Sequence, residues 1–195
     1  MAYLRGHLER RRLIRRAEGE DFRALNSPQP CLMCDPQDSL DDDIYNPCYT
    51  PYPGRQLYLM FPSFYHRIDA SVDVHLAISR DSYQWHRPAR YPIIDRHHAE
   101  GAYGMLYAVP NLIDTGKGEW HLPLVGHRRR HHFLERGSIY PEDGEFLWAT
   151  WQEDRLAGLE ASAEGEVVLV QRTCAGQEMR LNYRTAKDGW IKVEL

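Results

Sequence analysis

The stretch Val72-Asp-Val-His-Leu-Ala-Ile78 alternates apolar and polar side chains, which is the pattern of a β-strand with one buried face. Ser79-Arg-Asp-Ser-Tyr-Gln-Trp85 follows directly, and its Asp81 and Ser82 suit a tight turn. Strand-like alternation recurs in three further stretches: Gln56-Leu-Tyr-Leu-Met-Phe61, Gly144-Glu-Phe-Leu-Trp-Ala-Thr-Trp151 and Glu166-Val-Val-Leu-Val-Gln171. Short strands separated by turns predict an all-β fold.

Residues 4–18 are the one stretch that also fits a helix, because Leu4, Leu8 and Ile14 are loosely periodic. Its arginines suit either a charged helix face or a solvated hairpin. We expect the hairpin, because a strand repeat runs through the chain.

That repeat appears when the chain is compared with itself at an offset of 60 residues. Ala17 then aligns with Ala77, Asp21 with Asp81, and Pro28 with Pro88. A repeat of this length, made of strands, is typical of a β-propeller blade, whose faces are buried by neighbouring blades. We therefore expect residues 17–28 and 77–88 to share one local conformation.

Four strings together resemble a known group of proteins: Asp43-Ile-Tyr-Asn46, Leu57-Tyr-Leu-Met-Phe-Pro-Ser-Phe-Tyr65, the segment from Val72 to Pro88, and Gly104-Met-Leu-Tyr107. The group is the five-bladed β-propeller proteins of the arabinanase, xylosidase and fructosidase type of glycoside hydrolases. The resemblance covers nearly the whole chain. It implies hydrolysis of O-glycosidic bonds in a plant or microbial carbohydrate, by carboxylates at the propeller axis.

The chain departs from this group in two places and in extent. Ser82 stands where relatives usually carry glycine, and Glu100-Gly-Ala-Tyr103 replaces a Trp-Asp pair before Gly104. The chain has material for three to four blades, over residues 1–172, with an incomplete N-terminal blade. Residues 173–195 resemble closing strands or the start of a β-sandwich. The sequence thus reads as part of a longer protein or as a shortened relative.

Glycoside hydrolysis needs two carboxyl groups, one on each side of the scissile bond. Asp43 and Glu100 each precede a candidate inner strand, and their separation of 57 residues is close to the repeat period. We expect them at equivalent places in adjacent blades as the catalytic pair. Asp41-Asp-Asp43 equally fits a solvated acidic loop or a strand cap.

Four further residues are candidates for substrate binding. Tyr45 and Asn46 suit sugar stacking and hydroxyl recognition, although Tyr45 also fits a blade core. His131 belongs to the cluster His127-Arg-Arg-Arg-His-His132, which suits an acidic sugar, and the resemblance places a histidine near the end of this segment. The alternative for that cluster is a charged loop. Arg80 is the fourth candidate, and it also fits a structural pair with Asp81.

We expect no cofactor and no metal. Cys31-Leu-Met-Cys34 has zinc-ligand spacing, and Cys48 or a histidine would be needed to complete a site, but no second CxxC exists. The alternative of a calcium ion at the propeller axis stays open. The fold also admits a non-catalytic carbohydrate-binding or interaction propeller, because fold does not fix function.

Composition excludes some partners. Basic residues number 24 and acidic residues 28, so the net charge is −4, which argues against a nucleic-acid-binding protein. No apolar run is long enough for a spanning helix, and the first six residues lack the apolar core of a signal peptide. We expect a carbohydrate partner, no nucleic acid, no membrane and a cytoplasmic location.

Overall fold

The computed structural model describes residues 1–97, 103–131, 144–169, 176 and 181–194. The chain divides into two units, Met1–Gly158 and Leu159–Leu195. All strands of the described residues lie in the first unit. In the second unit, the strand expected at residues 166–171 does not form over residues 166–169, because no described strand pairs with them and their side chains are exposed. The expected boundary between residues 172 and 173 stays a prediction.

The first unit is all-β, as the alternation predicted, and its described residues contain one short 3₁₀ turn, η1 (Phe22–Ala24). Sheet A is antiparallel and consists of β1 (Ala2–Leu8), β2 (Arg11–Ala17) and β3 (Gln29–Leu32). Residues 4–18 therefore form the hairpin and not the helix. Glu9 and Arg10 turn the chain with positive φ angles of 48° and 66°, which match the twist of a two-residue hairpin loop.

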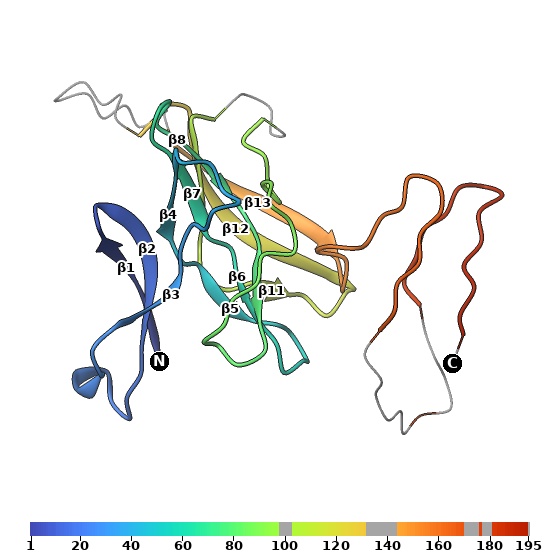
Figure 1. The fold of residues 1–195 in the computed structure, drawn as a ribbon, viewed down its shortest axis with the longest axis horizontal. Helices are drawn as coiled ribbons and strands as arrows, with labels where there is room; N and C mark the ends of the chain where they lie inside the picture. Colours follow the sequence, from blue (N-terminus) through green and yellow to red (C-terminus); the bar gives the residue numbers. More distant parts are fainter. Residues whose placement is uncertain (98–102, 132–143, 170–175, 177–180, 195) are drawn as a thin grey trace. The chain divides into compact units, whose positions relative to one another are not determined.

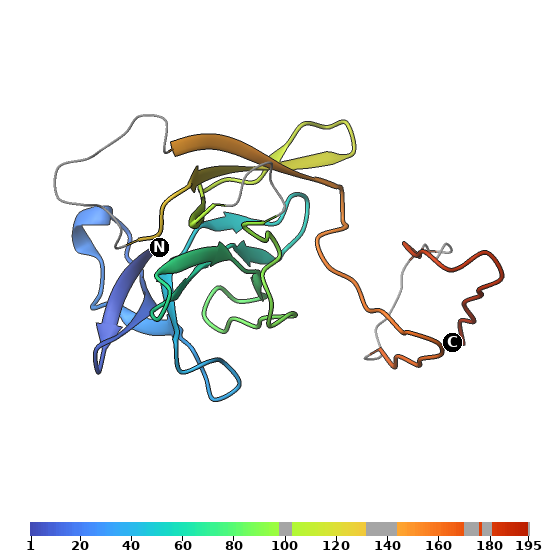
Figure 2. The same cartoon turned by 90° about the horizontal axis from the view of Figure 1, so that it is seen from above.

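The central sheet is the largest, and its hydrogen-bonded order is β11-β12-β10-β8-β7-β4, with β13 also paired to β12. Its members are β4 (Asp42–Asn46), β7 (Ser63–His66), β8 (Ser71–Val74), β10 (Met105–Ala108), β11 (Ile113–Asp114), β12 (Glu119–His127) and β13 (Gly144–Gln152). β8 and β10 run parallel, and the other pairs run antiparallel. In Figures 1 and 2 the blue hairpin β1–β2 lies beside β4 and away from the orange β13.

A third sheet continues three of these strands after a bend. It consists of β5 (Tyr49–Pro51), β6 (Tyr58–Met60) and β9 (Ala77–Ser79), all antiparallel. Residues 42–51, 58–66 and 71–79 are thus three bent runs of an antiparallel meander. The described strands close into neither a barrel nor a ring of blades, so the propeller arrangement stays a prediction.

The 60-residue offset has a local counterpart in hydrogen bonding. Asp21 accepts the backbone N–H of Arg23, and Asp81 accepts that of Tyr83, each two residues along the chain. The same offset relates two backbone bonds, from Asn26 N to Glu18 O and from His86 N to Ile78 O. These bonds support the repeat, while superposition of the whole stretches stays a prediction.

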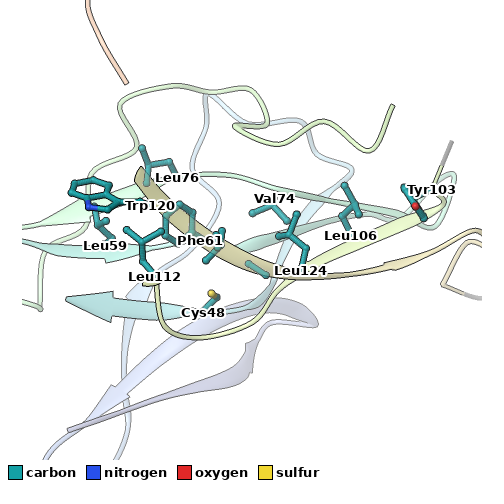
Figure 3. Close-up of a cluster of buried hydrophobic side chains, with 12 residues drawn as sticks. Cys48, Leu59, Phe61, Val74, Leu76, Tyr103, Leu106, Leu112, Trp120 and Leu124 are labelled. Atoms are coloured by element: carbon teal, nitrogen blue, oxygen red, sulfur yellow. The ribbon is translucent and has the colours of Figure 1, made fainter. Parts of the chain in front are cut away.

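Three apolar clusters lie within the described part of the unit, and the smallest consists of Tyr65, Ala70 and Val72. The largest is drawn in Figure 3 and includes Phe61, Val74, Leu106 and the fully buried Trp120. The second cluster joins all three sheets and consists of Ile14, Leu32, Ile44, Met60, Phe64 and Ala77. This second cluster packs β2 against β4, and that packing brings the arginines of the hairpin to the polar residues of β4.

Candidate functional site

Asp43 is the second residue of β4, and its side chain is 0 % exposed. Its two oxygens accept hydrogen bonds from Arg11 Nε at 2.8 Å and Arg12 Nη1 at 3.0 Å. Arg11 also donates to the carbonyl of Asp42. The carboxylate therefore joins the hairpin to the central sheet, and no part of it reaches solvent. Its catalytic role stays a prediction, as does that of Glu100, which lies outside the described residues.

Two of the predicted binding residues meet although 86 positions separate them. His131 Nε2 and the Tyr45 hydroxyl share a hydrogen bond of 2.9 Å, with ring centroids 5.1 Å apart. The ring centroid of Tyr65 lies 5.1 Å from that of His131, and the ring centroid of Tyr107 lies 6.1 Å from that of Tyr45. The backbone N–H of His131 donates to the carbonyl of Ala70 at 2.8 Å, which fixes the residue beside the sheet. We call Tyr45, Tyr65, Tyr107 and His131 the tyrosine–histidine cluster.

Two arginines of the hairpin cover this cluster. The Arg5 guanidinium lies 4.4 Å from the centre of the Tyr45 ring, and that of Arg12 lies 4.8 Å from the centre of the Tyr65 ring. Both distances suit cation–π attraction. Arg12 is also bound to Asp43, whereas the side chain of Arg5 is exposed and has no hydrogen bond or ion pair to any described residue. The donors of Arg5 are therefore available to a ligand.

Burial has one clear electrostatic effect in the cluster. It raises the pKa of Tyr107 and of Tyr65 above the ordinary value for tyrosine. Both hydroxyls stay protonated at neutral pH, and that of Tyr107 donates to the sulfur of Met105 at 3.3 Å. With Arg5 and Arg12 over it, the cluster presents cationic and neutral groups, and the Asp43 carboxylate beside it is paired with Arg11 and Arg12.

The other two binding candidates lie elsewhere. Asn46 is half-buried at the end of β4, where it faces Ser63 of β7 in the strand ladder. Arg80 is exposed on the turn after β9. The Asp81 carboxylate accepts bonds from Ser79 and from the backbone of the turn, and these bonds lower its pKa. In the described structure Asp81 forms no ion pair with Arg80, and the turn is held by the Asp81 carboxylate together with the Ser79 hydroxyl, which accepts the backbone N–H of Ser82 at 2.9 Å.

A partly buried chain of hydrogen-bonded polar side chains joins β4, β7 and β8, and the sequence analysis missed it. His66 Nδ1 bonds Asp42 at 2.7 Å, His66 Nε2 bonds Asp73 at 3.0 Å, and His75 Nε2 bonds Asp73 at 3.0 Å. The bond to Asp73 is the main cause that raises the pKa of His66 to about 9. Burial disfavours a charged Asp73, but its bonds to His66 and His75 outweigh this and lower its pKa to about 2. The sequence did contain a signal for this polar chain, namely the polar residues Asp73 and His75 within an otherwise apolar strand.

Metal ligation has weak support in this geometry. Among the described residues, Asp41, Asp42 and His66 are the one group whose ligand atoms lie close enough to share an ion. Both ring nitrogens of His66 are already bonded to carboxylates, which leaves none for a metal. Cys31 and Cys34 join no such group in the described part of the chain, and burial raises their pKa values to about 11 and 12. Among the described residues the two cysteines thus lack the further ligands that a zinc site needs.

Comparison with protein-family models, with curated proteins and with solved structures finds no match. Within the described residues, no helix has the length and apolar character to cross a membrane.

Proposed function

We propose that this protein binds an acidic carbohydrate, such as a uronic-acid oligosaccharide, at the tyrosine–histidine cluster. One observation carries the proposal. An exposed guanidinium, that of Arg5, lies over the ring of Tyr45, whose hydroxyl is bonded to His131. Cation, aromatic ring and polar hydrogen-bonding groups thus meet at one surface.

Each of these groups matches a part of an acidic sugar. A planar guanidinium pairs with a carboxylate through two parallel hydrogen bonds. Aromatic rings pack against the apolar C–H face of a sugar ring, while hydroxyl and imidazole groups bond its hydroxyls. Arg5 would take the carboxylate, and the Tyr45 hydroxyl, oriented by its bond to His131, would bond a hydroxyl of the sugar. Asp43 acts indirectly in this scheme, because it holds Arg12 over Tyr65.

Glycoside hydrolysis is the second candidate, favoured by the position of Asp43 opposite Tyr65 in the strand ladder, next to the cluster. Catalysis by Asp43 and Glu100 would require Arg11 and Arg12 to release the carboxylate when substrate binds. Binding without turnover needs no such rearrangement. We therefore place binding first.

Isothermal titration calorimetry with trigalacturonic acid tests the proposal. Arg5→Gln removes the free cation, and Arg23→Gln is the matched control, since Arg23 is an exposed arginine at η1. Hydrogen bonds to a charged group contribute about 1.5–3 kcal/mol, so Arg5→Gln should weaken binding about 10- to 100-fold. Arg23→Gln should bind like the wild type. Absence of binding by the wild type, or equal binding by Arg5→Gln, would overturn the proposal.

A further inference from the structure

The strand β13 presents two aromatic side chains to solvent. Phe146 and Trp148 are 61 % and 54 % exposed, and their ring centroids lie 5.5 Å apart. The alternate residues Leu147, Ala149 and Trp151 pack on the other side of the strand, against the largest apolar cluster. One face of β13 is therefore part of the core, and the other is an exposed aromatic face.

This exposed face is continuous with the tyrosine–histidine cluster. Residues directly opposite each other in an antiparallel pair have their side chains on the same side of the sheet. Tyr107 of the cluster pairs with Val125 of β12, and Val125 pairs with Phe146 of β13. His127 lies on the same side, with its ring centroid 6.3 Å from that of Tyr107. A row of side chains therefore runs from the cluster across β10 and β12 to β13.

The row has room for several sugar rings. The ring centroids of Tyr45 and Tyr107 lie 6.1 Å apart, and those of Phe146 and Trp148 lie 5.5 Å apart. Neighbouring strands are about 4.8 Å apart, so Phe146 lies about 10 Å beyond Tyr107, two strands away. A pyranose is comparable in width to an aromatic ring. A ligand that spans this row is thus a chain of sugars, longer than the one ring that Arg5 would hold.

The polar groups of the row suit a carbohydrate that carries negative charge. His121 and Thr150 share a hydrogen bond of 3.0 Å, and the His121 ring meets the Trp148 ring edge-on at 6.3 Å. On this face, positions 121–127 of β12 and 144–150 of β13 include no carboxylate that would repel an acidic ligand. The cation at the cluster end of the row, Arg5, attracts it.

A second copy of the chain is a poorer occupant of this face. A stable protein interface buries about 800 Å² on each partner. Each aromatic side chain buries about 150–250 Å², so Phe146 and Trp148 together supply at most about 500 Å². A sugar chain needs no further apolar area, because its hydroxyls bond the polar groups of the row.

We infer that the carbohydrate-binding surface extends from the tyrosine–histidine cluster over Tyr107 and His127 to Phe146 and Trp148. Its ligand is a chain of several uronic-acid residues, whose rings distant from Arg5 stack on the two aromatic side chains of β13. This inference rests on the proposed function, because it assigns the remainder of the same binding surface.

Isothermal titration calorimetry with trigalacturonic and hexagalacturonic acid tests the inference. The hexamer should bind the wild type about tenfold more tightly than the trimer. Trp148→Ala should remove about three- to tenfold of the hexamer affinity and leave trimer binding unchanged. Phe22→Ala, which removes an exposed ring at η1, is the matched control and should bind both oligomers like the wild type. A gain that came only from the larger number of binding registers on a longer chain would persist in Trp148→Ala.

A second measurement needs no variant. In the ¹⁵N-labelled wild-type chain, the indole N–H resonance of Trp148 should shift in a saturable way with hexagalacturonic acid, and clearly less with the trimer. An unshifted Trp148 resonance on saturation with the hexamer would overturn the inference.

The calorimetry separates this inference from the proposed function. Equal affinity of the wild type for the two oligomers, or a full hexamer gain in Trp148→Ala, would overturn the extended surface, while trimer binding that depends on Arg5 would keep the proposed function. Absence of binding by both oligomers would overturn both. A wild-type dimer in analytical ultracentrifugation that Trp148→Ala dissociates would assign the face to a second copy and would also overturn the inference.

Discussion

Replacement of Asp43 by asparagine is expected to destabilise the protein strongly. The side chain keeps its shape but loses the charge that faces Arg11 and Arg12. Removing one partner of a buried ion pair costs about 3–5 kcal/mol, because the remaining charge is left without compensation. Here the arginines are 32 % and 24 % exposed and can regain some water, which places the cost near the lower value of about 3 kcal/mol.

The expected loss is large enough to measure by thermal unfolding. For a unit of this size, each kcal/mol lowers the melting temperature by about 2–4 °C, so Asp43→Asn should melt about 6–12 °C lower. Asp114→Asn is the matched control, since Asp114 is exposed on β11 and bonds only a backbone N–H that asparagine can also bond. That variant should stay within about 0.5 kcal/mol of the wild type.

A double-mutant cycle with Arg12→Gln separates the ion pair from other effects of the substitution. If the pair is the cause, the two changes together should cost less than the sum of the single changes, by about 1 kcal/mol or more. A fully stable Asp43→Asn, or strictly additive losses, would refute the structural role assigned here. A stable Asp43→Asn that had also lost a hydrolytic activity would instead support the catalytic role.

The remaining predictions concern the polar chain and the core. The pKa of His66 in the folded protein, about 9, exceeds the ordinary value of 6.5. The contribution of His66 to the free energy of unfolding is therefore complete below pH 6.5 and is lost as the pH rises to 9. The unfolding free energy from urea titrations should fall by up to about 3 kcal/mol over that interval, and His66→Gln should flatten this slope; equal slopes would contradict it. The pH dependence that Asp73 causes has the opposite direction. Because its pKa in the folded protein is about 2, the free energy of unfolding should fall as the pH drops below 3.8. Asp73→Asn should reduce this loss of stability in acid. Trp120→Ala should cost about 3–5 kcal/mol in the same assay and Trp120→Phe clearly less, because phenylalanine refills much of the space; equal losses would argue against this packing.

Alternation within single strands was enough to predict the all-β class. Val72, Val74 and Leu76 are buried on β8 and just beyond it, as their spacing indicated. The hairpin at residues 4–18 was also predicted, although Leu4 and Leu8 are exposed and gave the misleading helical period. The period was misleading because an exposed edge strand places no constraint on its outward side chains.

The sequence alone did not predict which residues the site residues contact. Tyr45 and His131 were each chosen, but nothing in the local pattern indicated that they share a hydrogen bond. Asp43 was chosen as a catalytic group because its spacing from Glu100 fits the repeat. Its pairing with Arg11 and Arg12 depends on how the hairpin packs against β4, which local periodicity does not encode.

The most direct test of the proposed function is an NMR titration of the full chain with trigalacturonic acid, observing the ring resonances of Tyr45 and His131. The structure predicts saturable shifts at both rings, and their loss in Arg5→Gln but not in Arg23→Gln. Unchanged resonances at Tyr45 and His131 while the ligand binds elsewhere, or no binding at all, would contradict the assignment of this cluster as an acidic-carbohydrate site.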